Sequence, residues 1–350
     1  MEEDARGTLD VFRQVRGKLP ALVRHPDGRP LLICFAAEGG RGQVVALDPS
    51  SGETHSLSGK NVDCADLAAV ARRKDVTVVW SELTDGVYQL FESDLSGSAP
   101  RRVTDAPSSA VCPALTTDAG GRPILVYQCA DADGKFSIHL RRRKGRGWSD
   151  PVHVSDSPGN NWCPAVARLS DGRIAVAWDG YAAGSYDIYL RFFSMELEPE
   201  PTMRLTGDAL FHANVSLAPA PDDAVWVAWN RGTPRWGKDN EVYRTTRIPE
   251  RGFLHARRFL EVRRVAGDRV LPVFPPVQDV MDEVLPGLLH ERPRLFAAPD
   301  GPLHVAFRFN EGELRGGHRN EKRWQAMVTC YDGQTWSEVQ PTTAPPVLSA

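Results

Sequence analysis

The chain repeats one motif about every fifty residues, and its two clearest copies are consecutive. One runs from Cys112 through Gly121 to Tyr127, and the next runs from Cys163 through Gly172 to Trp178. Each copy contains two short apolar runs joined by a glycine turn, which is the pattern of a tight antiparallel hairpin. A period of this length built from hairpins predicts a radial array of small sheets, a β-propeller.

Six copies can be placed along the chain, and each ends its second apolar run on an aromatic residue. These aromatic residues are Phe35, Trp80, Tyr127, Trp178, Trp229 and Phe307. Third and fourth strands follow the hairpins, for example at 185–191 and 148–154. We therefore predict an all-β fold, a six-bladed β-propeller made of four-stranded antiparallel blades. The predicted blades span residues 19–60, 61–109, 110–159, 160–210, 211–263 and 291–340.

The spacing of the copies lengthens before the last one, where an insertion occupies 264–290. This insertion is rich in proline, which predicts an ordered loop rather than a strand. A strand at 9–16 is expected to help close the ring, and 335–339 is expected to add a strand at the other end. Residues 1–346 are thus predicted to form one propeller domain, followed by a Pro-rich tail at 341–350 that is similar to the start of a linker.

Composition argues against several classes of partner. The net charge of −3 is close to neutral for this length, so neither nucleic acid nor an anionic membrane is an expected partner. No apolar run reaches the roughly 18 residues of a membrane span, and the acidic start is not a secretory signal. A cytoplasmic monomer is expected, and a trimmed leader would instead place the protein in the periplasm or outside the cell. The six cysteines form no CxxC pair, so no metal or other cofactor is expected.

Three cysteines, Cys64, Cys112 and Cys163, occupy the same position at the head of a first strand. Three converging thiolates would suit a soft metal, but a small apolar residue at a crowded axis is the simpler interpretation. A cross-strand disulfide between Cys112 and Cys129 would be strained and is not expected in a reducing compartment.

The repeats also carry a resemblance. The fourth copy reads Pro-Ala-x-x-x-x-x-Asp-Gly-Arg-x-x-x-x-Trp at 164–178 and Tyr-Asp-Ile-Tyr-Leu-Arg at 186–191, and the third ends in Gly-x-x-Trp-Ser-x-Pro at 145–151. Over most of 19–340 this pattern resembles the repeats of sialidase-like and TolB-like bacterial propellers. The resemblance implies the fold and leaves the function open, because that superfamily spans glycosidases, polysaccharide lyases, lectins and interaction modules. A true sialidase is not expected. In that family the Arg-Ile-Pro landmark lies in the first blade, whereas here it falls in the fifth copy, at 247–249.

In a propeller, the loops before each first strand and after each second strand emerge on one face, around the central funnel where ligands bind. Aromatic side chains there can stack on a flat ligand, and arginines can hold a carboxylate or phosphate by forked hydrogen bonds. Phe211 also falls in one of these loops. The predicted ligand-binding residues are Asn160, Asn161, Trp162, Asp179, Tyr181, His212, Asn214, Asn230, Arg231, Trp236, Glu291, Arg292, Arg308 and Glu311.

This set favours a non-catalytic binding module that recognises a polar ligand, a glycan or a protein partner at the funnel face. A second hypothesis is a carbohydrate-active enzyme, a polysaccharide lyase or glycoside hydrolase acting on an anionic sugar at the same face. His212, His290, Tyr181 and Arg308 would then be catalytic, with histidine or tyrosine as the base and arginine neutralising the acid group. A third is an accessory propeller for a catalytic domain on another chain. For any one of these residues, capping a strand end is the simpler role.

Overall fold

The computed structural model describes residues 18–38, 41–182, 184–232, 258–284, 289–297, 301–310, 314–315, 318–319 and 324–342. The described residues form mainly strands, joined by turns and loops, with one α-helix among them. The chain divides into two compact units, the first comprising Met1–Gly134 and Arg141–Asp150, and the second comprising Lys135–Leu140 and Pro151–Ala350. Every residue predicted to bind ligand belongs to the second unit.

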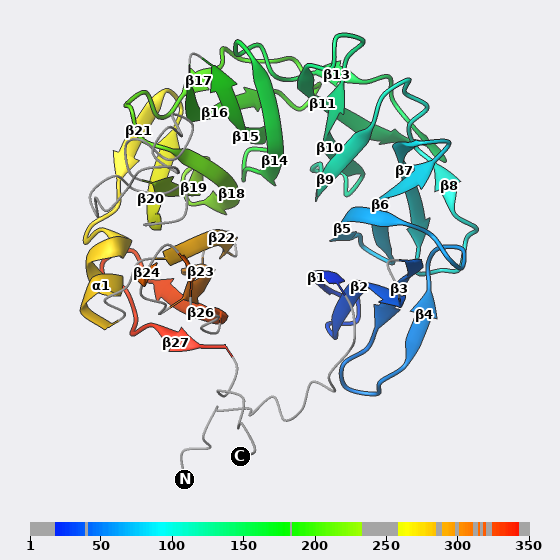
Figure 1. Cartoon of the computed structure of the whole chain (residues 1–350), viewed down its shortest axis with the longest axis horizontal. Helices are drawn as coiled ribbons and strands as arrows, with labels where there is room; N and C mark the ends of the chain where they lie inside the picture. The colour runs from blue at the N-terminus through cyan, green and yellow to red at the C-terminus, as the bar shows by residue number, and fades with distance from the viewer. Residues whose placement is uncertain are drawn as a thin grey trace. The chain divides into compact units, whose positions relative to one another are not determined.

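The first unit contains antiparallel hairpins that each extend into a small sheet (Figure 1, blue to cyan). Its first sheet has the order β1-β2-β3-β4 and its second the order β5-β6-β7-β8. The strands β9 and β10 follow, together with the C-terminal part of β11, which pairs with β12. Their bounds are β1 Lys18–Arg24, β2 Pro30–Glu38, β3 Arg41–Leu47, β4 Thr54–Ser56, β5 Cys64–Ala71, β6 Val76–Thr84, β7 Val87–Asp94, β8 Arg101–Arg102, β9 Ala110–Thr117, β10 Pro123–Ala130, β11 Phe136–Lys144 and β12 Gly147–Trp148.

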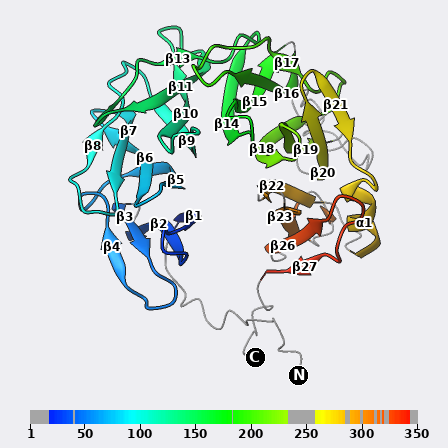
Figure 2. The ribbon, with the colours of Figure 1, turned by 180° about the vertical axis from the view of Figure 1, so that it is seen from behind.

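The second unit holds the N-terminal part of β11 with β13, a sheet of order β14-β15-β16-β17, and an eight-stranded sheet (Figure 2). The larger sheet consists of the groups β18–β21 and β22-β23-β26-β27, joined by a single parallel pair, Arg258 with Leu289. The strands β24 and β25 pair only with each other. The bounds are β13 Val152–His153, β14 Asn160–Arg168, β15 Ile174–Ala182, β16 Ser185–Phe193, β17 Met203–Arg204, β18 His212–Ala220, β19 Ala224–Gly232, β20 Arg258–Ala266, β21 Arg269–Pro272, α1 Val277–Val284, β22 Leu289–Ala297, β23 Leu303–Asn310, β24 Leu314–Arg315, β25 His318–Arg319, β26 Trp324–Tyr331 and β27 Gln340–Pro341.

The six predicted hairpins are confirmed as the antiparallel pairs β1/β2, β5/β6, β9/β10, β14/β15, β18/β19 and β22/β23. The β9/β10 turn shows why the motif needs its residues. Gly121 has a φ of 78° and donates its N–H to the Asp118 carbonyl over 2.9 Å. The Asp118 carboxylate in turn accepts the N–H of Arg122 at 2.9 Å. The fold is therefore all-β with propeller-type sheets, and its arrangement as six blades stays a prediction.

The aromatic residues that close the second strands form the centres of the packing. Trp80, Trp178 and Trp229 are 0%, 0% and 2% exposed. In each unit the first strands of neighbouring sheets touch, as β5 and β9 do, and as β14, β18 and β22 do in the second unit. Burial of a large ring between sheets contributes much of the apolar stabilisation of such a repeat.

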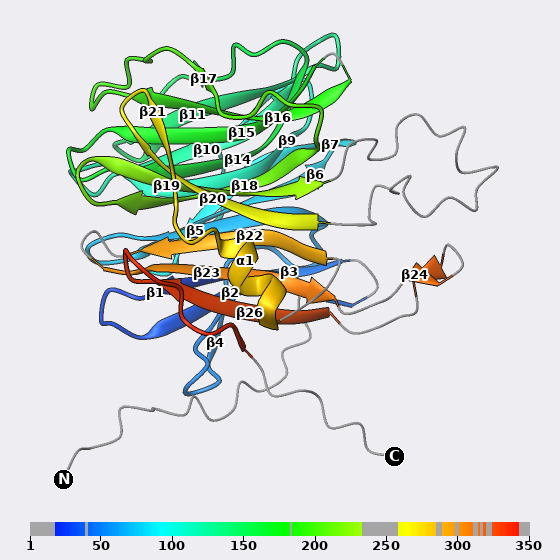
Figure 3. The same ribbon diagram turned by 90° about the vertical axis from the view of Figure 1, so that its left-hand side faces the viewer.

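The predicted loop at 264–290 instead contains secondary structure, which corrects the expectation drawn from its prolines. It includes the end of β20, the strand β21 and the helix α1, which packs against β20 (Figure 3). Val277 and Met281 of α1 are 2% and 0% exposed. Pro272 is tolerated because it ends an edge strand, and Pro275 and Pro276 lie before the helix, where a missing N–H costs nothing.

Three terminal predictions have different outcomes. Within 335–339 the described chain forms only an isolated bridge between Tyr331 and Trp336, and the outer strand β27 comes directly after it. The predicted strand at 9–16 lies outside the described residues. So does the predicted tail at 341–350 from residue 343 onward.

A buried ion-pair network links β7 to the β11/β12 hairpin inside the first unit. The Glu92 carboxylate, 3% exposed, accepts hydrogen bonds from both terminal nitrogens of Arg143, at 2.7 Å for Nη1. Arg101 Nη2 lies 3.1 Å from the same carboxylate, and Trp148 Nε1 donates to it over 3.1 Å. The Arg143 guanidinium also lies 4.6 Å over the Trp148 ring. Because little water reaches either the Glu92 carboxylate or the Arg143 guanidinium, each charge is stabilised mainly by the opposite charge beside it.

Candidate functional site

A β-bulge near the start of each first strand shapes the rim of the second unit. At these bulges Cys163, Asn214 and Arg292 have φ values of 50°, 61° and 54°, and the pairing register shifts at the same points. A left-handed residue in a bulge changes the direction in which the neighbouring side chains point. The bulge therefore determines which side chains point outward at the rim.

The bulges at Asn214 and Arg292 are each held by a polar side chain from the preceding hairpin. The Asp179 carboxylate accepts the N–H groups of Asn214 and Val215 at 2.7 and 3.2 Å. The Asn230 amide does the same for the next strand, accepting the N–H of Arg292 at 2.8 Å. Asp179 and Asn230 are 4% and 1% exposed, so both act mainly from beneath the rim. Burial raises the pKa of Asp179 to about 7, against the opposing effect of its two backbone hydrogen bonds.

A second repeated position anchors the closing aromatic residues. Asn161, His212 and His290 each lie two residues before a bulge residue and are 1%, 1% and 0% exposed. Trp178 Nε1 donates to Asn161 Oδ1 over 2.9 Å, and Trp229 Nε1 donates to His212 Nδ1 over 2.9 Å. These residues lie inside the second unit rather than on its rim.

The ring environments of the two histidines agree with an anchoring role. With Nδ1 accepting from the tryptophan, His212 Nε2 carries the proton and faces Asp208 Oδ1 at 2.8 Å. The His290 ring stacks on Phe309 at 5.3 Å and 18°, with the edge of Phe307 at 5.8 Å. Both predicted catalytic histidines are thus packed against buried aromatic rings.

Beside these anchors lies a pocket of about 260 Å³, which we call the arginine pocket. Five predicted residues line it, namely Asn214, Asn230, Glu291, Arg292 and Arg308. Arg258 at the start of β20 and Trp324 at the start of β26 complete the described lining. The described lining therefore comprises three arginines, one glutamate, two asparagines and one tryptophan.

The contacts within the arginine pocket hold its cations in place. Arg308 Nη2 donates to Glu291 Oε2 over 2.8 Å, and its guanidinium lies 4.2 Å from the Trp324 ring centre. Arg258 is only 6% exposed and its guanidinium lies 3.9 Å from the Phe211 ring centre. Stacked arginines lose little further freedom when they bind an anion, which favours forked recognition of a carboxylate or phosphate.

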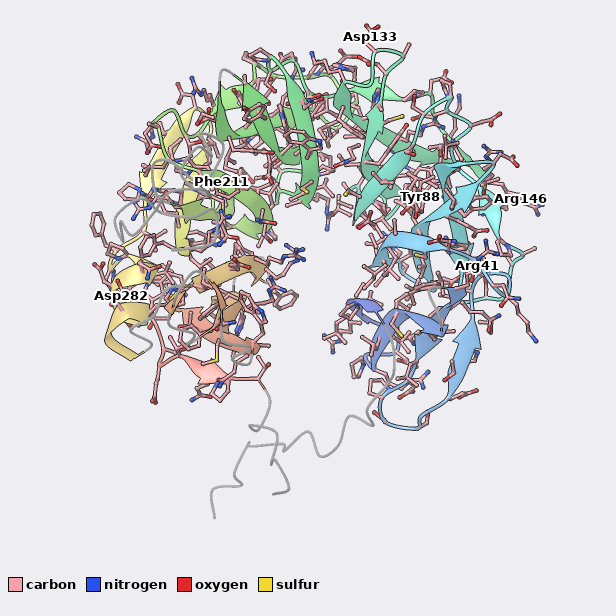
Figure 4. All side chains as sticks on the ribbon, viewed as in Figure 1. Arg41, Tyr88, Asp133, Arg146, Phe211 and Asp282 are labelled. Carbon is pink, nitrogen blue, oxygen red and sulfur yellow. The ribbon has the colours of Figure 1, made fainter. Side chains whose placement is uncertain are left out.

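An aromatic cluster occupies the neighbouring part of the rim. We call Trp162, Tyr181 and Tyr186 the aromatic platform; all three are partly exposed. Their ring centres lie 5.4 Å apart for Trp162–Tyr186, 4.9 Å for Tyr181–Tyr186 and 6.3 Å for Trp162–Tyr181. Phe211, labelled in Figure 4, lies 5.2 Å from Tyr186 and so joins the platform to Arg258.

The other predicted residues are distributed around this rim. Asn160 Oδ1 accepts the N–H of Phe136 at 2.9 Å, which ties it to β11. Arg231 lies 3.6 Å from the Glu261 carboxylate and over the Phe259 ring, away from the lining of the arginine pocket. Trp236 and Glu311 lie outside the described residues.

The sequence reasoning missed Tyr186, Arg258 and Trp324, and all three lie at the beginning of a third strand. The hairpin between second and third strands places them on the rim, since Tyr186 pairs with Tyr181, Arg258 with Gly232, and Trp324 with Asn310. The repeat could have indicated these residues. The loop after each second strand leads into a third strand, so the start of the third strand lies on the rim as well.

Within the described ranges, no three His, Cys, Asp or Glu side chains gather as a metal ion would require. No disulfide joins any of the six cysteines, which all lie in the described ranges, and Cys129 pairs across its hairpin with Ala110 rather than Cys112. The one helix described is far too short and polar to traverse a bilayer.

Comparison with known proteins gives structural likenesses of low identity. No protein-family model matches the chain, and no curated protein does. A putative TolB from Agrobacterium tumefaciens is 15% identical, with a TM-score of 0.47 over 74% of this chain and 82% of that one. A thermostable family-43 glycoside hydrolase is 11% identical, with a TM-score of 0.45 over 83% and 97%. A protein of unknown function from Dyadobacter fermentans is 12% identical, with a TM-score of 0.48 over 91% and 96%.

Proposed function

We propose that this chain is a six-bladed propeller acting as a binding module, and that the arginine pocket recognises a small anionic ligand. The ligand would carry a carboxylate or phosphate held by Arg258, Arg292 and Arg308, while Asn230, whose amide binds the Arg292 N–H and the His290 carbonyl, supports the pocket from beneath. The proposal rests on the residues that line one pocket, not on any likeness to another protein.

The observation that carries the proposal is that three arginines line a pocket of about 260 Å³, with a single acidic residue in the described lining. Cations placed this close together repel one another unless an anion lies between them. Glu291 already neutralises part of this charge through Arg308. The described lining thus keeps a positive excess, and its size suits a small polar molecule such as one sugar acid.

An enzyme acting on an acidic sugar is the alternative, and it needs a base that can reach the substrate. His212 and His290 are 1% and 0% exposed and pack against aromatic rings. Tyr181 lies on the aromatic platform, and among the predicted catalytic residues Arg308 is the one that lines the pocket. The geometry therefore favours binding over turnover, and an accessory role beside a catalytic chain is compatible with it.

A thermal-shift screen tests the proposal, because a ligand present at 100 times its Kd adds about 2.7 kcal/mol to the stability of the native state. Glucuronate, galacturonate, inorganic phosphate and sulfate are compared with glucose and galactose. We expect stabilisation by at least one anion and by neither neutral sugar, and loss of that effect in Arg308→Ala. Arg168→Ala, an exposed arginine at the far end of β14, is the matched control.

No stabilisation by any anion would contradict the binding proposal. Incubation with a uronate polymer such as polygalacturonate, followed by ultraviolet absorbance for the unsaturated uronate that elimination of the neighbouring sugar leaves, tests the lyase alternative. A product formed from a uronate polymer and lost in Arg308→Ala would replace the binding proposal with the enzyme.

A further inference from the structure

The arginine pocket does not end at Arg258, because aromatic contacts continue along the rim. The Arg258 guanidinium lies 3.9 Å from the Phe211 ring centre, Phe211 lies 5.2 Å from Tyr186, and Tyr186 lies 5.4 Å from Trp162. Each step is a direct contact between neighbouring side chains. Two largely buried side chains, Arg258 and Phe211, therefore join the arginine pocket to the aromatic platform within the second unit.

Strand register places both parts at the same end of their sheets. Asn160 pairs with Tyr181 at the head of β14, and Gly232 at the end of β19 pairs with Arg258. The backbone of Gly232 approaches this junction closely, since a Cβ there would lie 3.1 Å from Phe211 Cβ and 3.5 Å from Arg258 Nη1. The end of β19 is thus packed tightly against the junction between the two parts.

The angles within the aromatic platform limit what can cover it. The ring planes meet at 32° for Trp162–Tyr186, 40° for Trp162–Tyr181 and 49° for Tyr181–Tyr186. A flat nucleic-acid base stacks best on a parallel ring face. A puckered sugar ring, which offers C–H groups at several angles, fits a tilted surface better.

Building on the proposed function, we infer that the ligand is an acidic oligosaccharide rather than a single anion. Its acidic sugar occupies the arginine pocket, and a neutral sugar ring next to it lies on the aromatic platform. The arginine pocket gives specificity for an acidic sugar. The aromatic platform gives preference for a longer chain over a single sugar.

Two ligands of equal charge separate these contributions in a calorimetric titration. One is glucuronate, and the other is aldotriouronic acid, in which one glucuronate carries two neutral xylose rings. We expect the trisaccharide to bind about three- to tenfold more tightly, the gain that one aromatic contact provides. Trp162→Ala abolishes the difference in affinity between the two ligands, whereas Arg308→Ala weakens the binding of both.

Tyr181→Ala is a second variant for the case that Trp162→Ala unfolds, and Phe296→Ala, at a 68% exposed phenylalanine, is the control. Equal affinities for both ligands, or a gain that survives Trp162→Ala and Tyr181→Ala, would overturn the oligosaccharide and leave the anion site standing. A Trp162-dependent gain for adenosine monophosphate over inorganic phosphate, without one for the trisaccharide, would replace the sugar by a nucleotide. Binding of neither acid nor phosphate would instead refute the proposed function itself.

Discussion

The buried carboxyl of Asp179 should make the stability of this protein depend on pH in an unusual direction. Asp179 is 4% exposed and supports the bulge at Asn214 through two backbone hydrogen bonds. Those bonds favour the ionised form, but burial outweighs them and raises its pKa from 3.8 to about 7. Asp179→Asn keeps an acceptor oxygen for the bulge and removes the titration.

The size and sign of the effect follow from this shift. Below pH 3.8 the carboxyl is protonated in both the folded and the unfolded chain, and its contribution to stability is fully present. Between pH 3.8 and about 7 the unfolded chain loses its proton first, so stability falls as pH rises. Because one pKa unit corresponds to 1.36 kcal/mol, the full loss approaches about 4 kcal/mol.

Urea unfolding of the wild type and of Asp179→Asn, followed by tryptophan fluorescence at pH 4.5, 6 and 8, measures this contribution. We expect the wild type to lose stability relative to the variant as the pH rises through this range. The comparison cancels the other carboxyls, including Asp48 and Asp332, whose pKa values are lowered mainly by backbone hydrogen bonds. A difference between the two proteins that stays constant with pH would refute the reasoning.

Two further predictions concern packing. Glu92→Gln should destabilise the protein by about 3 to 5 kcal/mol, since it leaves a buried guanidinium without its counter-charge; the thermal midpoint should fall, while Glu53→Gln, at a 64% exposed side chain, should leave it unchanged. A similar midpoint for both variants would show that the network contributes little. Gly180→Ala should cost about 1 to 3 kcal/mol, because a Cβ there would lie 2.6 Å from the Tyr189 ring, whereas Gly147→Ala has open space and should be neutral.

The hairpins could be predicted from the sequence because their signal is local. A turn such as Asp118–Gly121 needs glycine for its positive φ and aspartate for its backbone hydrogen bond, so the repeat shows both. Proline at 264–290 misled the prediction because edge strands and helix starts also tolerate it. Arg258 was missed because its place on the rim depends on pairing with Gly232, a contact between distant parts of the chain that the local sequence does not reveal.

The candidate site was predicted only in part, for a related reason. Polarity suggested His212 and His290 as surface residues, yet both occupy the repeat position of Asn161, which anchors a buried tryptophan. The residue type alone does not distinguish a histidine that packs in the core from one at an active site. Arg308 could be predicted because it lies beyond the aromatic residue of its strand, where the chain reaches the rim.

The most direct test of the central claim is a calorimetric titration of the protein with glucuronate and with glucose, repeated for Arg308→Ala and for the control Arg168→Ala. If the arginine pocket holds an acidic sugar, glucuronate binds to the wild type and to the control, its affinity falls with added salt, and glucose does not bind. Arg308→Ala, which removes a guanidinium that lines the pocket, should weaken glucuronate binding at least tenfold, or about 1.4 kcal/mol. Equal binding of glucuronate and glucose, or an unchanged affinity in Arg308→Ala, would contradict the account.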